Sequence, residues 1–124
     1  MGVTTTIDRY NRRVFTVAVG ELTFDQLLDA VSGLLVNPAF NPEYDHLMDL
    51  SGVRIFNLNT SEVIRFAGRG IFSETSRRAV VAPSNEAFGI TNVYVMFRKA
   101  PSENLRIFRN IDEAREWLDG TVSQ

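Results

Sequence analysis

The sequence predicts an α/β fold in which an N-terminal hairpin is followed by alternating strands and helices. Two strand-like segments, 4–10 and 14–20, flank residues 11–13 and are rich in Thr, Val and Ile. A short apolar run at 45–53 ends in Asp-Leu-Ser-Gly, which is typical of a central strand covered along its length. Strand-like and helical segments then alternate to the C-terminus. This order predicts a mixed sheet of four or five strands with four helices.

Length and composition predict one soluble domain. The 124 residues can bury roughly two-thirds of their unfolded surface, so we expect a single domain over 1–124 with an ordered core at about 5–119. A net charge of −2 argues against a nucleic-acid partner. The absence of cysteine excludes disulfides and thiolate metal sites. No signal peptide or membrane span is visible, and we expect a cytoplasmic protein without integral membrane association.

The first helix has clear start and stop signals. Thr23 is expected to be its N-cap, with Gln26 at capping-box distance. Apolar residues then recur at helical spacing as far as Leu35, and Asn37-Pro38 ends the helix.

A second helix follows the central strand. Residues 53–56 between them fit either a strand extension or a packed turn. Asn59 or Thr60 caps the helix, which we expect to include Gly68-Arg69-Gly70 and Ile71. A helical Gly-Arg-Gly triplet lacks the strand-loop-helix context of a phosphate loop.

The remaining elements are a strand, a helix, a strand and a helix, at 77–83, 85–99, 105–109 and from 110 onward. The helix at 85–99 is the hardest assignment, because 93–97 has β-prone residues. Its length and its place between two buried strands favour a helix. Asn110 and Glu113 form a further capping-box pair.

Three groups of residues carry a family resemblance, together with Asp49-Leu50-Ser51-Gly52-Val53 after the central strand. They are Asn37-Pro38-Ala39-Phe40, then Arg78-Ala79-Val80-Val81-Ala82-Pro83-Ser84 leading to Phe88-Gly89, then Ile107-Phe108-Arg109 leading to Glu113-Ala114 and Trp117-Leu118. The Asp-Leu-Ser-Gly-Val stretch resembles the STAS fold of bacterial anti-sigma-factor antagonists, and the whole chain resembles the small SpoIIAA-like family. The resemblance implies a mixed sheet packed with helices. Many members have no assigned activity, and some are discussed alongside lipid-transfer domains.

The sequence differs from the STAS antagonists at the site of their regulatory phosphorylation. STAS antagonists carry a phosphorylatable serine in an Asp-Ser-Ser-Gly context at the start of the next helix. Here the stretch at 57–62 lacks both the Asp and the Gly, although Thr60 and Ser61 lie nearby. A phosphorylation-controlled antagonist is therefore the less favoured interpretation.

Catalytic and metal-binding constellations are not apparent. His46 is the single histidine, and its place at the entrance of the central strand favours a structural role over a catalytic relay. Asp49 fits an acceptor for backbone N–H groups or a partner of Arg54 or Arg78 better than a pocket acid. We expect no enzyme activity, no metal and no cofactor.

Two helix N-termini form a candidate anion or regulatory site. They are expected at the same end of the sheet and involve Asn59, Thr60, Ser61, Ser84 and Asn85. The alternative is that these side chains only cap their own helices.

A surplus of apolar residues in the helix at 85–99 predicts an interaction surface. The candidate interface or apolar groove comprises Phe66, Phe72, Phe88, Val95 and Met96. The first hypothesis is a non-enzymatic STAS-like binding or regulatory module, dimeric through 88–97. The alternative is a small carrier of a lipid or amphiphile, with a groove lined by phenylalanines and Met96.

Overall fold

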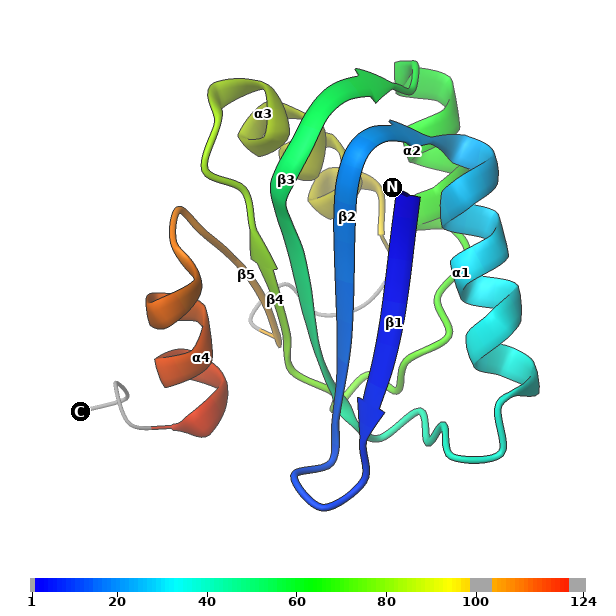
Figure 1. Cartoon of the computed structure of the whole chain (residues 1–124), viewed down its shortest axis with the longest axis vertical. Coiled ribbons are helices and arrows are strands. Elements are labelled where there is room, and N and C mark those ends of the chain that lie inside the picture. The colour runs from blue at the N-terminus through cyan, green and yellow to red at the C-terminus, as the bar shows by residue number, and fades with distance from the viewer. Residues whose placement is uncertain (1, 99–103, 121–124) are drawn as a thin grey trace.

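A computed structural model describes residues 2–98 and 104–120 of the chain, and within these ranges it contains one five-stranded sheet and four helices (Figure 1). In chain order, the elements are β1 (Gly2–Asp8), β2 (Arg13–Thr23), α1 (Phe24–Val36), β3 (Asp45–Asn57), α2 (Thr60–Ala67), β4 (Arg78–Val81), α3 (Asn85–Phe97), β5 (Leu105–Phe108) and α4 (Ile111–Asp119). This order confirms the predicted hairpin followed by alternating strands and helices.

The strands lie in the sheet in the same order as in the chain. β1 and β2 pair antiparallel, while β2–β3, β3–β4 and β4–β5 are parallel. The sheet is therefore mixed, and β3 holds the central position that the sequence predicts.

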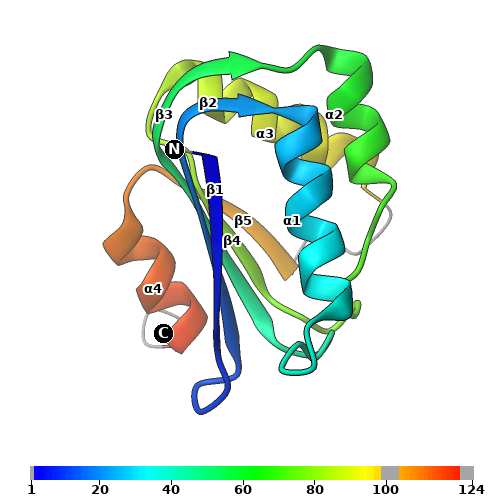
Figure 2. The ribbon, with the colours of Figure 1, turned by 45° about the vertical axis from the view of Figure 1, so that its right-hand side comes forward.

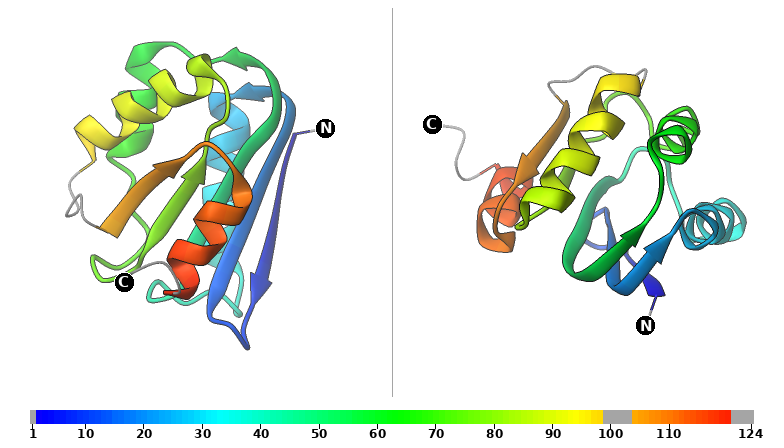
Figure 3. Two further views of the ribbon diagram at one scale, coloured as in Figure 1. Left: turned by 90° about the vertical axis from the view of Figure 1, so that its left-hand side faces the viewer. Right: turned by 90° about the horizontal axis from the view of Figure 1, so that it is seen from above.

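Helices cover both faces of the sheet unequally. α1, α2 and α3 lie on one face and α4 lies alone on the other (Figures 2 and 3). The two faces follow from the alternation of side chains along each strand. On the three-helix face, Leu50 and Val80 pack with Leu27 of α1. On the opposite face, Leu47 and Val81 pack with residues of α4.

The helix starts largely follow the predicted capping signals. Thr23 and Gln26 form the expected capping box of α1. Asn59, rather than Thr60, is the N-cap of α2. The N-cap of α4 is Asn110, whose side chain accepts a hydrogen bond from the backbone N–H of Glu113.

The helix assignment for the β-prone segment is also confirmed, because α3 continues through Phe97. Packing against α2 and the sheet outweighs the local preference of 93–97 for a strand.

The central strand is longer than the apolar run at 45–53 that predicts it. β3 continues through Asn57, so the ambiguous residues 53–56 belong to the strand. Beyond Leu50, however, β3 pairs only with β2, and Ile55 is 59% exposed. β4 is too short to pair with this part of β3, and the pairing between the two strands ends at Asp49.

Gly52 lies at an irregularity in this β2–β3 pairing, where the register shifts between Val17 and Val19. A Cβ atom at Gly52 would approach Ala18 O to 3.3 Å and Val19 Cγ2 to 3.2 Å. The close approach of β2 therefore favours glycine here.

The prediction that α2 includes Gly68-Arg69-Gly70 and Ile71 is also wrong. The helix ends at Ala67, and Gly68 is its C-cap. Two glycines within three residues disfavour a helix by about 1 kcal/mol each. Ile71 lies in the following loop and packs against the cluster of Val14, Leu34 and Tyr44.

Two leucines of α1 test this packing. Leu27 is 6% exposed and Leu35 is 61% exposed. Leu27→Ala is expected to lower the free energy of unfolding by about 2–5 kcal/mol, because it removes buried apolar atoms. Leu35→Ala, the matched control, should change it by less than about 0.5 kcal/mol. Denaturant titration followed by circular dichroism measures both, and equal losses would contradict the placement of α1.

Candidate functional site

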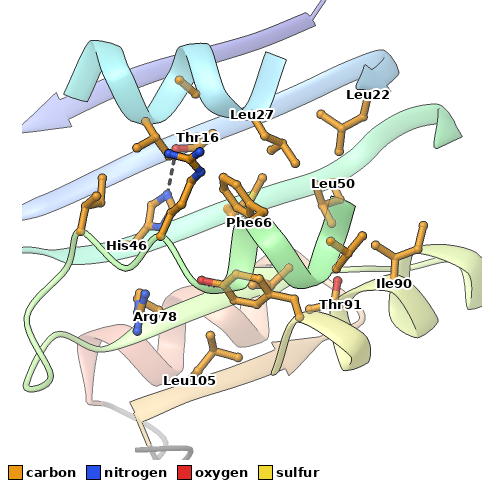
Figure 4. Close-up of a pocket in the computed structure, with 18 of the residues that line it drawn as sticks. Thr16, Leu22, Leu27, His46, Leu50, Phe66, Arg78, Ile90, Thr91 and Leu105 are labelled. Atoms are coloured by element: carbon orange, nitrogen blue, oxygen red, sulfur yellow. Dashed lines mark hydrogen bonds between the residues drawn. The ribbon is translucent and has the colours of Figure 1, made fainter. Parts of the chain in front are cut away.

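A cavity of about 110 Å³ lies between the sheet and the three helices on its more heavily covered face (Figure 4). Its lining is mostly apolar and includes Leu22, Leu27, Leu50, Phe66, Val80 and Ile90. These residues come from three of the strands and all three helices, so the cavity depends on the assembled fold.

Polar side chains gather at one end of this cavity. Thr16 of β2, His46 of β3 and Arg78 of β4 contribute to the lining from adjacent strands. His46 and Arg78 are register partners on parallel strands, and a hydrogen bond of 2.8 Å joins His46 Nε2 to Thr16 Oγ1. In Figure 4, His46 and Arg78 lie at one end of the view, and Leu22 and Ile90 lie toward the other. The cavity therefore has a polar end and an apolar body.

Arg78 is the buried cation of this polar end. Its residue is 6% exposed, and its Nε atom has no hydrogen-bond partner among the described residues. Its guanidinium lies 5.7 Å from the ring centroid of Phe72. Burial lowers the pKa of Arg78, while interaction with the hydroxyl of Tyr94 acts in the opposite direction. An arginine nevertheless stays protonated in proteins, so this end of the cavity carries a positive charge.

The pKa of Tyr94 on α3 is shifted by the same surroundings. Burial raises the pKa of its hydroxyl above the ordinary value, and the neighbouring Arg78 charge only partly opposes this. Tyr94 is therefore neutral near pH 7 and can act as a hydrogen-bonding group beside the guanidinium.

His46 lies against the same aromatic ring. Its ring stacks on Phe72, with centroids 4.7 Å apart and planes 14° from parallel. Although some surface of the residue remains accessible, desolvation of the ring lowers its pKa to about 3, with a further contribution from the charge of Arg78. The imidazole is therefore neutral at ordinary pH.

The Thr16–His46 pair has the spacing of a hydroxyl nucleophile and a base. A general base works best when its pKa is near the operating pH, and the pKa of His46 lies far below it. The lowered pKa therefore makes His46 a poor general base for Thr16.

The predicted role of Asp49 is confirmed in part. Its Oδ1 accepts a hydrogen bond from the backbone N–H of Ser51 at 2.9 Å. Pairing with Arg78 is excluded by the alternation of strand residues. Asp49 points to the same face as Leu47, toward α4, whereas Arg78 faces the cavity.

The five residues of the predicted interface or groove are separated by the fold. Phe66 and Phe72 line the cavity, whereas Phe88, Val95 and Met96 do not. The ring of Phe88 lies 4.3 Å from the guanidinium of Arg109. Val95 is half-buried, and Met96 is 74% exposed near the end of α3.

The predicted anion-site residues lie at the two helix starts that follow β3 and β4. Asn59 Oδ1 accepts a hydrogen bond from Glu62 N at 2.8 Å, and Ser84 Oγ accepts one from Ala87 N at 3.0 Å. Thr60, Ser61 and Asn85 are exposed. The two helices start at the same end of the sheet (Figure 1), away from the polar end of the cavity at the beginnings of β3 and β4.

The described residues contain neither a metal-binding cluster nor a membrane-spanning helix. Within 2–98 and 104–120, no three His, Asp or Glu side chains come together as a metal site would require. No helix in the same ranges is long and apolar enough to cross a bilayer.

Sequence reasoning missed the cluster of Thr16, His46, Arg78 and Tyr94. The sequence of β4 does carry one signal. Side chains alternate along a strand, so Arg78 and Val80 share one face and Ala79 and Val81 share the other. The neighbours of Arg78 on β3 and α3, and the contact of His46 with Thr16 on β2, depend on the pairing register, which no single segment encodes.

Comparison with known proteins identifies the fold. The chain is similar to the crystal structure of an uncharacterised protein of the DUF3478 family with a SpoIIAA-like fold, from Shewanella loihica PV-4. The likeness has a TM-score of 0.62 and 20% sequence identity, and it covers 94% of each chain. No protein-family model and no curated protein matches the sequence. The chain thus has the SpoIIAA-like fold that its sequence predicts, and a shared fold does not assign a function.

The pKa of His46 makes a prediction about stability and pH. The unfolded chain takes up a proton at His46 near pH 6.5, whereas the folded chain does so only near pH 3. The free energy of unfolding should therefore fall as the pH is lowered below 6.5, by up to about 1.4 kcal/mol per pH unit.

Denaturant titrations between pH 7 and about 5.5, where ordinary carboxylates remain almost fully ionised, measure this effect. His46→Gln should flatten the dependence. A wild-type protein with constant stability across this window would show that the imidazole is not desolvated.

Proposed function

We propose that this protein is a non-enzymatic binding module for a small, largely apolar molecule. The single observation that carries the proposal is the cavity of about 110 Å³ between the sheet and α1, α2 and α3. The lining is mainly apolar, and covering apolar surface stabilises a complex by about 25 cal/mol per Å² removed from water. A ligand that fits the space without displacing the lining gains this free energy.

The volume favours a small ligand over a long-chain lipid. Ligand pockets usually begin at about 300 Å³, and an engineered cavity of about 150 Å³ binds benzene. This cavity is smaller than either but partly open to solvent, so the expected ligand is a short branched chain or a single small ring that extends into the opening. This narrows the carrier predicted from the sequence to a carrier of a small amphiphile.

The absence of enzyme activity is part of the proposal. Thr16 and His46 lie within hydrogen-bonding distance as a nucleophile and a base would, but the lowered pKa of His46 makes it a weak base. Binding alone needs no such group. The apolar lining and the polar end are sufficient for recognition.

A protein-contact role is a second candidate, and one observation favours it. Met96 is 74% exposed and Phe97 is 47% exposed at the end of α3. These residues belong to the segment 88–97 that the sequence predicts as a homodimer interface. Sedimentation equilibrium would give the mass of a dimer for the wild-type protein and of a monomer for Met96→Glu, while a monomeric wild type would contradict this candidate.

Toluene titration tests the binding function directly. In ¹H–¹³C spectra of methyl-labelled protein, toluene should cause saturable shifts of Leu27 and Leu50, which line the cavity. Val31→Phe should abolish these shifts, because Val31 lines the cavity and a larger side chain there occupies the space.

Val36→Phe is the matched control. Val36 is 82% exposed on the same helix, so the same substitution should leave the toluene shifts intact. Toluene shifts that are absent in the folded wild type, or that persist unchanged in a folded Val31→Phe variant, would contradict the proposed function.

A further inference from the structure

We propose that the cavity selects a small organic monoanion, whose carboxylate pairs with Arg78 and whose apolar part fills the space between the sheet and the helices. This inference rests on the binding function proposed above and specifies the chemical class of its ligand.

The first support is the charge of the lining. The chain as a whole has 15 acidic and 13 basic side chains. The described residues that line the cavity nevertheless include two arginines, Arg69 and Arg78, and neither an aspartate nor a glutamate. The local charge is therefore opposite in sign to the net charge of the protein. A cavity of this kind attracts anions and disfavours cations.

The second support is the incomplete pairing of Arg78. Burying a cation without a counter-ion is costly, so buried charges in proteins are normally paired. Arg78 has no carboxylate within 4 Å among the described residues, and its Nε is without a hydrogen-bond partner there. A ligand carboxylate would satisfy both the charge and the free donor.

The neighbouring arginine shows how the same chain satisfies a cation elsewhere. Arg77 donates hydrogen bonds to the backbone carbonyls of Trp117 at 2.6 Å and Leu118 at 3.3 Å. Its guanidinium also lies 4.3 Å from the centroid of the Trp117 ring. The contacts of Arg77 with α4 therefore come from backbone carbonyls and an aromatic ring of the protein itself. Arg78 faces the cavity, and its Nε has no hydrogen-bond partner within residues 2–98 and 104–120.

The third support is the arrangement of neutral polar groups around the cation. His46 is the register partner of Arg78, and the Tyr94 hydroxyl interacts with the guanidinium. The Thr16 hydroxyl lies beside His46. One cation surrounded by neutral hydrogen-bonding groups matches a singly charged carboxylate, which a guanidinium binds through two parallel hydrogen bonds. A doubly charged phosphate would require a second buried cation, and Arg69 is exposed.

Ligands of one shape and different charge test the inference. Benzoate, benzamide and toluene share a ring of the expected size, and only benzoate is an anion. Their dissociation constants can be measured from the methyl shifts of Leu27 and Leu50, which line the cavity. The imidazole signal of His46 is a second reporter, since it is the only histidine. Benzoate should bind the wild type at least about tenfold more tightly than benzamide.

Arg78→Met should remove this preference while toluene still binds. Because the substitution deletes a buried charge, we expect an unchanged or higher melting temperature. Removal of an arginine with a purely structural role would lower the melting temperature. Arg78→Lys should restore part of the preference. The matched control is Arg106→Met on β5, whose guanidinium lies over Trp117 on the opposite face of the sheet, and it should retain the full preference.

The outcomes separate the two proposals. Toluene binding with equal affinities for benzoate and benzamide would overturn the anion preference and leave the binding function standing. A preference for benzoate that persists in Arg78→Met would overturn the role of Arg78. If neither toluene nor benzoate binds to the folded wild type, both proposals fail.

Discussion

The parallel pairing of β3 with β2 on one side and β4 on the other is the constraint on which the structure depends. In a parallel sheet, register partners point to the same face and successive residues point to opposite faces. The pairing of His46 with Arg78 and of Met48 with Val80 therefore directs four side chains toward α1, α2 and α3. The intervening residues pack against α4. One register thus decides both which residues form the two cores and which residues surround the cavity.

The same constraint creates an energetic conflict on the three-helix face. That face must be apolar to hold the helices, yet the register places Arg78 on it. The protein accommodates the charge with the Phe72 ring, the Tyr94 hydroxyl and a neutral His46, and these groups only partly replace the water that the guanidinium loses. The void and the incompletely paired cation lie in the same cavity. An amphiphilic anion would cover the apolar lining with its apolar part and pair with the cation through its charge.

Much of the fold could be predicted because its signals are local. Capping residues such as Thr23 and Asn110 mark helix starts, and the alternation of elements gives the sheet type. The end of α2 is predicted incorrectly, because two glycines weaken a helix whose apolar pattern continues to Ile71. The sequence leaves open whether 53–56 extends the central strand, because no local signal gives the length of the neighbouring strand β4.

The candidate site was predictable only in its apolar part. Phe66 and Phe72 were expected to line a groove and do line the cavity, because large aromatic residues beside helices are recognisable from the sequence. The surplus of apolar residues in 85–99 groups Phe88, Val95 and Met96 with them, but these three residues do not line the cavity. Arg78 was considered only as a partner of Asp49. Its neighbours His46, Phe72 and Tyr94 come from segments up to 32 positions away in the chain, and strand register and helix packing bring them together.

A crystal structure determined with benzoate would test the central claim most directly. The account predicts difference density for one benzoate in the cavity, with its carboxylate against the guanidinium of Arg78 and its ring toward Leu27 and Leu50. A cavity filled by protein side chains, or a benzoate bound with its carboxylate away from Arg78, would contradict it.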